Sequence, residues 1–353
     1  MRKTSTAVVI VAALAVTSPA ASGSSTACDI VGTEGDDTFV MVAAEGTVVC
    51  GLGGDDSLAR LDGGTFEGGS GDDSVGVLGR GTFNGGDGDD VGGASSMKNA
   101  TFNGGTGDDS APDMEHPGGV FNGGPGNDSA GEAVAGVFNG GEDDDWAATV
   151  SGTFNGEDGD DTAVDVVRGT FNGGDGDDVA HEANELGTVN GGNGTDSVGG
   201  LMHATFNGGK DDDEVRSVNG TFNGEDGNDR VRWGVYLDGT FDGGNGDDYS
   251  VEVDDRATFH GGDGSDSVLI LLEGTVDGGN GDDTVMRMVR ESGTFNGDNG
   301  SDSVTELEAG VFNGGNGVDT VGTMMWATFN GGNGADIVLH AGEGSTINDD
   351  QPR

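Results

Sequence analysis

The sequence is poor in the residues that an ordinary globular domain of its length needs. Its 353 residues include 14 Lys and Arg, 5 Pro and 2 Cys, with 6% aromatic and 32% hydrophobic side chains. The shortage of cations argues against nucleic acid and anionic membrane surfaces as partners, because both repel a polyanion. Low hydrophobicity with high net charge is typical of chains that stay disordered unless another component neutralises the charge.

Long hydrophobic runs are also missing. Residues 7–16 form an apolar run of ten residues, too short to cross a bilayer. The run follows Arg2 and Lys3 and precedes small residues around Ala20, which is the layout of a secretory signal peptide. We therefore expect residues 1–20 to be a signal peptide cleaved near Ala20, the mature protein to be secreted, and no transmembrane segment.

The two cysteines, Cys28 and Cys50, lie near the start of the expected mature chain. In an oxidising compartment such a pair more often forms a structural bridge than a reactive site, so we expect a disulfide. The alternative is a lipid anchor on Cys28, because residues 25–28 weakly resemble a lipoprotein cleavage site.

Glycine and acidic residues are abundant, with 75 Gly and 65 Asp and Glu, and they follow a repeat. The segment 81–90 (GTFNGGDGDD) recurs along the chain, and its Phe position is filled by Phe, Val or Ile from Ile30 to Ile347. These 19 positions are separated by 16 to 19 residues, with a mean of about 17.6. Such regular spacing indicates a repeat architecture rather than a biased low-complexity tract.

Two positions of the repeat never vary. All 18 complete copies have Gly two residues after the Phe position and Asp seven residues after it. The position before this Asp is looser and accepts Asn127, Thr195 and Val318, so a specific ligand role explains the pattern better than general acidity. The candidate metal ligands are Asp37, Asp56, Asp73, Asp90, Asp109, Asp128, Asp145, Asp161, Asp178, Asp196, Asp213, Asp229, Asp248, Asp266, Asp283, Asp302, Asp319 and Asp336.

The segments 85–91 (GGDGDDV) and 68–75 (GGSGDDSV) resemble the hemolysin-type calcium-binding repeat of RTX proteins, G-G-x-G-x-D-x-U-x. The resemblance covers essentially the whole expected mature chain, and it implies Ca²⁺ bound in stacked glycine-rich turns. RTX rolls carry two such loops per coil, whereas residues 76–80 lack the motif. We therefore expect one row of calcium sites along one edge.

The Thr-Phe-Asn triplet alternates polar and apolar residues, which is typical of a short strand with Phe directed inward. Together with the repeat, this predicts an all-β fold, a parallel β-solenoid of the β-roll or β-helix kind. We expect about 19 coils of 16–19 residues in a single domain over residues 28–353, beginning with degenerate coils. Phe side chains of successive coils should stack about 4.8 Å apart.

Calcium suits this repeat chemically. Ca²⁺ takes six to eight oxygen ligands from carboxylates and backbone carbonyls, and glycine allows the positive φ that a tight turn around an ion requires. Eighteen turns leave 17 gaps, so we expect about 17 Ca²⁺ ions in one row. Folding should depend on calcium, because the free chain would line up carboxylates at close spacing. The alternative is an acidic spacer without a specific metal.

A second array raises a different possibility. The residue before the Phe position is Thr in 14 of 17 copies, and the residue after it is Asn in 13 of 17. Such ranks resemble the ice-binding faces of some antifreeze proteins, although strand preference and internal Asn ladders explain them as well. We therefore consider a calcium-dependent protein of cell-surface or matrix material, an ice-binding protein and a calcium buffer.

Catalysis finds no support in the sequence. The five histidines lie in different repeats without a shared spacing, and no segment outside the repeats could house an enzyme domain. We therefore do not expect an enzyme.

Overall fold

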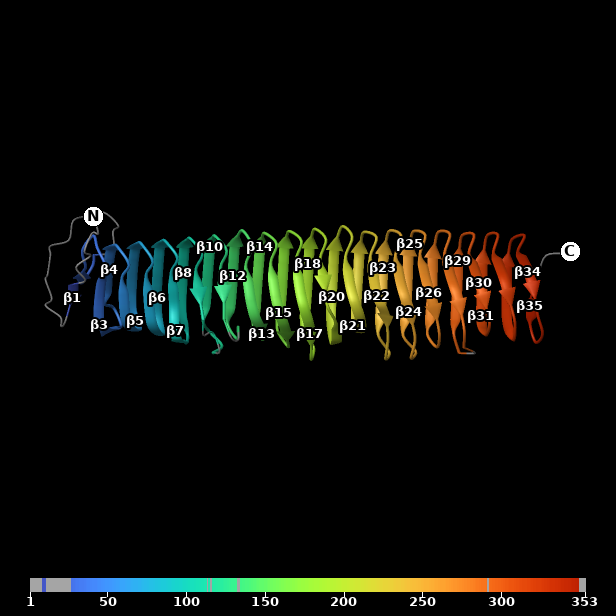
Figure 1. Cartoon of the computed structure of the whole chain (residues 1–353), viewed down its shortest axis with the longest axis horizontal. Helices are drawn as coiled ribbons and strands as arrows, with labels where there is room; N and C mark the ends of the chain where they lie inside the picture. The colour runs from blue at the N-terminus through green and yellow to red at the C-terminus, as the bar shows by residue number, and fades with distance from the viewer. Residues whose placement is uncertain are drawn as a thin grey trace, which may run out of the picture. The chain divides into compact units, whose positions relative to one another are not determined.

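The computed structural model describes residues 8–10, 27–112, 114, 116–131, 134–290 and 292–348. The chain divides into two compact units, residues 1–175 and 176–353. The described residues form strands and turns without helices, and in each unit successive coils pair in parallel as a β-solenoid (Figure 1). The expected fold class is therefore confirmed, with about 18 turns in place of the 19 coils expected.

Two expectations about the chain's organisation stay predictions. The signal peptide, residues 1–20, lies outside the described residues except for β1 (Val8–Ile10), whose backbone pairs with β3 (Asp37–Ala44). The single domain over residues 28–353 is likewise not established by the two units. The described part of the chain contains no helix that could span a membrane.

One coil shows the plan of all the others. β12 (Val137–Glu142) carries Phe138 and is a Phe strand; residues 143–145 form the Asp turn. β13 (Trp146–Val150) is the return strand, and residues 151–152 form the variable turn that leads to the next Phe strand. These four names apply to the equivalent segments of every coil.

The strands of the first unit follow this plan. The Phe strands are β2 (Ile30–Val31), β4 (Val48–Gly53), β8 (Ala100–Thr106), β10 (Val120–Pro125), β12, β14 (Thr153–Asp158) and β16 (Thr170–Asp175). The return strands are β3, β7 (Val91–Met97), β9 (Ser110–Ala111), β11 (Ser129–Ala130), β13 and β15 (Thr162–Val167). β5 (Ser57–Ser70) and β6 (Ser74–Asp87) each run from a return strand into the next Phe strand.

The strands of the second unit follow the same plan. The Phe strands are β18 (Thr188–Asn193), β20 (Leu201–Lys210), β23 (Thr240–Asn245), β25 (Thr258–Asp263), β27 (Thr275–Asn280), β29 (Thr294–Asn299), β31 (Gly310–Asn316), β33 (Ala327–Asn333) and β35 (Thr346–Asn348). The return strands are β17 (Val179–Asn184), β19 (Ser197–Val198), β22 (Arg230–Val235), β24 (Tyr249–Val253), β26 (Ser267–Leu271), β28 (Thr284–Met288), β30 (Ser303–Leu307), β32 (Thr320–Met324) and β34 (Ile337–Ala341). β21 (Glu214–Asp226) contains both kinds, and β20 begins with two residues, Leu201 and Met202, that pair with the return strand β17.

The repeat fixes the register between coils. Phe121 pairs with Phe138 and Asn122 with Asn139, although other coils differ in length. Phe83 still pairs with Phe102, 19 residues away, whereas Phe138 pairs with Phe154 after 16. The variable turn therefore absorbs the differences in length.

The core of each coil lies between its two strands. Stacked neighbouring Phe rings have centroids 4.7–5.2 Å apart, which confirms the predicted spacing and the inward direction of Phe. The return strands add two further stacks of buried apolar side chains to the core. These side chains lie two and five residues after the invariant Asp, as Val75 and Leu78 do. Val338, in the last coil, is only half-buried.

A disulfide joins the first two coils. Cys28 and Cys50 have sulfur atoms 1.97 Å apart. A Cys28 thiol in a disulfide cannot also carry a lipid, so this arrangement disfavours the alternative of a lipid anchor.

The Phe column should dominate the stability of the coils around it. Phe222 stacks between Phe206 and Phe241 with no exposed surface. We expect Phe222→Ala to lower the free energy of unfolding by about 3–5 kcal/mol, because the large side chain leaves a cavity. Urea unfolding followed by circular dichroism in calcium-containing buffer measures this. The control Leu339→Ala, 72% exposed, should cost less than about 0.5 kcal/mol; equal losses would contradict the core assignment.

Candidate metal site in the Asp turns

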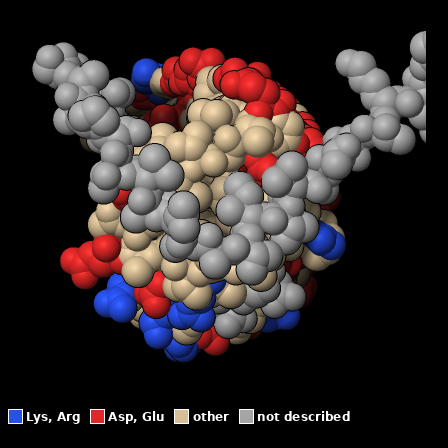
Figure 2. All heavy atoms as spheres, turned by 90° about the vertical axis from the view of Figure 1, so that its left-hand side faces the viewer, with Lys and Arg blue, Asp and Glu red and all other residues tan. Residues whose placement is uncertain are grey.

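The Asp turns place the invariant Asp of each coil at the same point, inside the turn. Those from Asp37 to Asp319 that the structure describes are at most 2% exposed, and Asp336 in the last coil is half-buried. Within each unit they follow one another from coil to coil along one edge. In the end view of Figure 2, Asp and Glu gather along one edge, whereas Lys and Arg lie mostly at the opposite edge.

One oxygen of each invariant Asp accepts a hydrogen bond from the backbone of the neighbouring coil. The backbone N–H of Asp90 donates to Oδ1 of Asp109 at 2.8 Å, and that of Asp128 donates to Oδ1 of Asp145 at 2.7 Å. The same bond recurs between Asp213 and Asp229 in the second unit. These bonds satisfy buried backbone N–H groups that would otherwise cost free energy.

The other oxygen is buried without a donor. Among the described residues, no hydrogen-bond partner faces Oδ2 of Asp56, Asp73, Asp90, Asp109, Asp128, Asp145, Asp196, Asp213, Asp229, Asp248, Asp266, Asp283, Asp302, Asp319 and Asp336. Buried polar atoms are normally paired, and each unpaired one needs an explanation. A recurrent unpaired carboxylate oxygen indicates a missing positive group.

The invariant Gly shapes the space in front of this oxygen. A methyl carbon added to Gly85 would lie 1.9 Å from Asp90 Oδ2 and 2.6 Å from the Gly104 carbonyl oxygen of the next coil. At Gly123 the corresponding distances are 1.8 Å to Asp128 Oδ2 and 2.7 Å to the Gly140 carbonyl oxygen. Carboxylate and carbonyl oxygens thus converge where any other residue would place its side chain. This donor set fits a hard cation such as Ca²⁺.

Burial makes these carboxylates reluctant to ionise. It raises the pKa of Asp90 and Asp109 to about 7 and that of Asp213 and Asp248 to about 8. The bond from the neighbouring backbone N–H opposes the rise, and the like charges of nearby acids add to it. At neutral pH the turns therefore need either protons or a cation.

The residue before the invariant Asp behaves differently. The N–H of Asp108 donates to Asp89 Oδ1 at 2.9 Å, and that of Asp144 donates to Asn127 Oδ1 at 3.1 Å, both on the exposed side of the turn. At this position an amide oxygen accepts the hydrogen bond just as a carboxylate oxygen does. Asn is frequent elsewhere in the repeat but never replaces the buried Asp, so that position requires the carboxylate itself.

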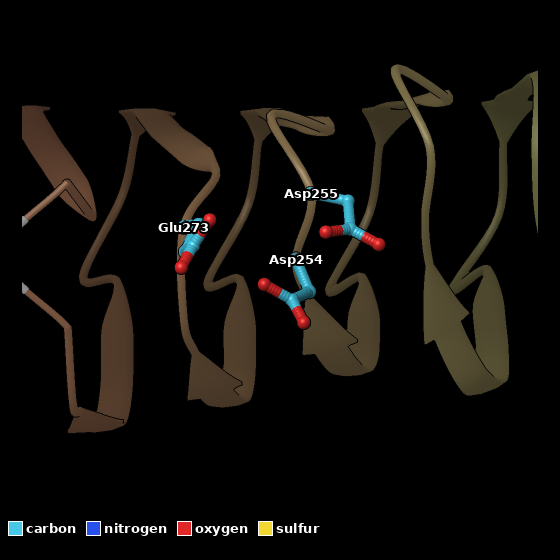
Figure 3. Close-up of side chains that lie close together, drawn as sticks. All are labelled: Asp254, Asp255 and Glu273. Atoms are coloured by element: carbon cyan, nitrogen blue, oxygen red, sulfur yellow. The ribbon is translucent and has the colours of Figure 1, made fainter.

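A second acidic cluster, which the sequence did not reveal, lies in the second unit. Asp254, Asp255 and Glu273 bring one carboxylate oxygen each within 4.8 Å of one another (Figure 3). Nη1 of Arg290 lies 2.5 Å from Glu273 Oε1 and 3.8 Å from Asp254 Oδ1. The cluster already holds a cation of the chain, and because variable turns carry no repeat signal, only the folded structure reveals it.

The predicted Thr and Asn ranks both occur on the Phe strands. Nδ2 of Asn122 donates to Asn103 Oδ1 and Nδ2 of Asn139 to Asn122 Oδ1, each at 2.7 Å, so these side chains form internal ladders. In the second unit the ladder is interrupted by Asp242 and His260. The Thr rank makes no comparable ladder among the described residues.

The raised pKa values predict how pH acts on the calcium-free protein. The folded-state values of about 7 exceed the ordinary value of 3.8. Their contribution to stability is therefore fully present below about pH 4 and is lost as the pH rises through about 7. We expect calcium-free protein to show more strand signal by circular dichroism at pH 4.5 than at pH 8. More strand signal at pH 8 would show that the buried carboxylates are stable as bare anions.

No family model matches the chain, and no curated protein does. Among solved structures, the chain is similar to one described as a hyperactive, Ca²⁺-dependent, β-helical antifreeze protein from an Antarctic bacterium. The two share 21% sequence identity with a TM-score of 0.44, over 81% of this chain and 87% of that one.

Proposed function

We propose that the protein binds Ca²⁺ in a row along its Asp turns and folds as it does so. The observation that carries the proposal is the recurrent carboxylate oxygen, buried without a donor and facing a carbonyl oxygen of the next coil. No hydrogen-bonding pattern within the described coils accounts for it. The geometry of the turns supports a metal row, and so does the resemblance to RTX repeats.

The residues that would hold the ions are the 18 invariant Asp and the carbonyl groups of the invariant Gly. When bound, Ca²⁺ supplies the positive charge that keeps the carboxylates ionised inside the turn. About 17 ions would fit one row, one between each pair of neighbouring turns. Because ligand binding to the folded state alone stabilises it, calcium and folding are coupled.

We further propose that the protein is secreted and acts as a structural or interaction module without catalytic activity. The leader-like residues 1–20 and the Cys28–Cys50 disulfide support export to an oxidising compartment. Extracellular calcium modules bind at roughly 10⁻⁴ to 10⁻³ M, which suits that setting. Cell-surface or matrix material is the partner class that we propose.

Two neighbouring aspartates in one Asp turn provide a matched test of the calcium site. Asp90→Asn removes a charge from the buried position and Asp89→Asn removes one from the exposed position. We expect calorimetry to show one to two fewer Ca²⁺ ions bound for Asp90→Asn, because its turn faces two gaps, and an unchanged number for Asp89→Asn.

The two variants carry the same net charge, so any difference reflects position. Equal calcium binding by both variants and the unmodified protein would show that the buried Asp is only a hydrogen-bond acceptor. Equal losses in both would indicate diffuse attraction by acidic surface rather than a defined site.

Ice binding is the second candidate, and the Thr rank favours it. Thr188, Thr205, Thr221, Thr240, Thr258, Thr275 and Thr294 occupy successive coils of the second unit, and each is half-exposed. Their hydroxyl groups have no hydrogen-bond partner among the described residues. A regular rank of free hydroxyl and methyl groups, repeated at coil spacing on one strand face, can order water.

Substitution within the rank tests this candidate. We expect Thr258→Tyr to remove most thermal hysteresis of the calcium-loaded protein, because a bulky side chain breaks the flat array. Thr323→Tyr, at an exposed position of a return strand, should leave it unchanged. If the unmodified protein shows no thermal hysteresis at high concentration, the ice-binding proposal is wrong, whereas the calcium proposal is unaffected.

A further inference from the structure

An open groove of about 550 Å³ crosses the return strands of the second unit. It runs from β17 across β19 to β21 and β22, begins directly after the Asp turns, and includes no residue of those turns or of the Thr rank. His181 and Glu182 form one wall; Glu214, Arg216, Arg232 and Trp233 form the other. We call it the Arg216 groove.

A glycine opens the groove. Ala180 pairs with Val198 and Val198 with Val215, so Gly199 lies level with His181 on one side and Arg216 on the other. A methyl carbon at Gly199 would lie 2.0 Å from the His181 carbonyl oxygen, so the backbone there excludes a side chain. The coil of β19 therefore forms a bare floor between two coils with long polar side chains.

The Arg216 wall concentrates positive charge in an acidic protein. Arg216 and Arg232 are two of the chain's 14 Lys and Arg, whereas its formal net charge is −51. The guanidinium of Arg216 lies 3.5 Å from the centroid of the Trp233 ring. Stacking on an aromatic ring holds the guanidinium plane while leaving its N–H donors free.

The charges on this wall are not all neutralised within the protein. Arg232 pairs with Glu214, but Arg216 has no ion-pair partner among the described residues. Trp233, whose ring lies against Arg216, is itself 53% exposed. Arg216 is thus a fixed, available donor at the edge of a groove.

We propose that the Arg216 groove binds an acidic saccharide, a sugar with one carboxylate such as a uronic acid within a polysaccharide. The planar guanidinium matches a carboxylate with two parallel hydrogen bonds. His181 and Glu182 on the facing wall accept hydrogen bonds from hydroxyl groups, and Glu182 repels ligands of high negative charge. The volume lies within the range of small-ligand sites.

This pairing of one positive and one negative wall selects for single charge and many hydroxyl groups. A nucleic acid or a highly sulfated chain would meet both Glu182 and the overall negative charge of the protein. A neutral sugar would leave the Arg216 donors without a charged acceptor. The groove therefore gives a chemical identity to the surface or matrix material proposed as partner.

Binding of matched oligosaccharides to the full-length, calcium-loaded protein tests the inference. The ligands are a glucuronate-containing oligosaccharide and the same oligosaccharide with its carboxylates reduced to alcohols, measured by calorimetry. We expect the acidic form to bind at least about tenfold more tightly, since a charge-assisted pair is worth that much. Arg216→Ala should remove the preference, Arg216→Lys should restore only part of it, and Trp233→Ala should weaken binding.

Arg256→Ala is the matched control, because Arg256 is an exposed arginine paired with Asp238 in a variable turn. It should change affinity less than about twofold. Equal binding of the reduced oligosaccharide, equal loss in Arg256→Ala, or displacement of the sugar by an equal concentration of sulfate would overturn the proposal. Circular dichroism checks that each variant folds, and Arg216→Gln is used if Arg216→Ala does not fold. Calcium stoichiometry, measured separately, keeps this result distinct from the calcium proposal.

Discussion

The fold depends on one buried carboxylate per coil. Its Oδ1 accepts the backbone N–H of the preceding coil, and its Oδ2 faces a carbonyl oxygen of the following coil without a donor. The first contact joins coils, whereas the second leaves negative charge in a desolvated turn. An isolated buried charge is too costly to persist, so the group must be protonated or paired with a cation. In the proposed function, Ca²⁺ resolves this conflict at neutral pH, where protons no longer do.

The remaining features of the repeat follow from this constraint. The invariant Gly is needed because the carboxylate fills the place of its side chain. The Phe strand must enter the turn in a fixed register, so Phe stacks on Phe and Asn bonds to Asn. The far edge of the coil has no such requirement, and there the chain varies in length and composition. Sites that differ from coil to coil, such as the Arg216 groove, are built on the return strands, whose outward side chains also vary.

Much of this arrangement could be predicted from the sequence, because the repeated residues lie in the Phe strand and the Asp turn, the half of each coil whose geometry is constrained. The regular period predicted the parallel solenoid. Phe121 and its equivalents predicted the stacked Phe side chains of the core, and the invariant Asp predicted the position of the turn. The return strand was harder to predict. Its buried position at Leu78 and Met288 is filled by Leu, Val, Met or Ala in different coils. The contact of Arg216 with Trp233 depends on the register between coils rather than on sequence spacing. The reason for the invariant Gly also emerged only from the distances in the folded turn.

Circular dichroism and hydrodynamic radius at pH 8, before and after removal of calcium, test the account most directly. The account predicts that the strand signal falls and the chain expands when calcium is chelated, and that both changes reverse when calcium is restored. Unchanged strand signal and radius in the presence of chelator would show that the buried carboxylates do not need the ion. The central claim would then be wrong.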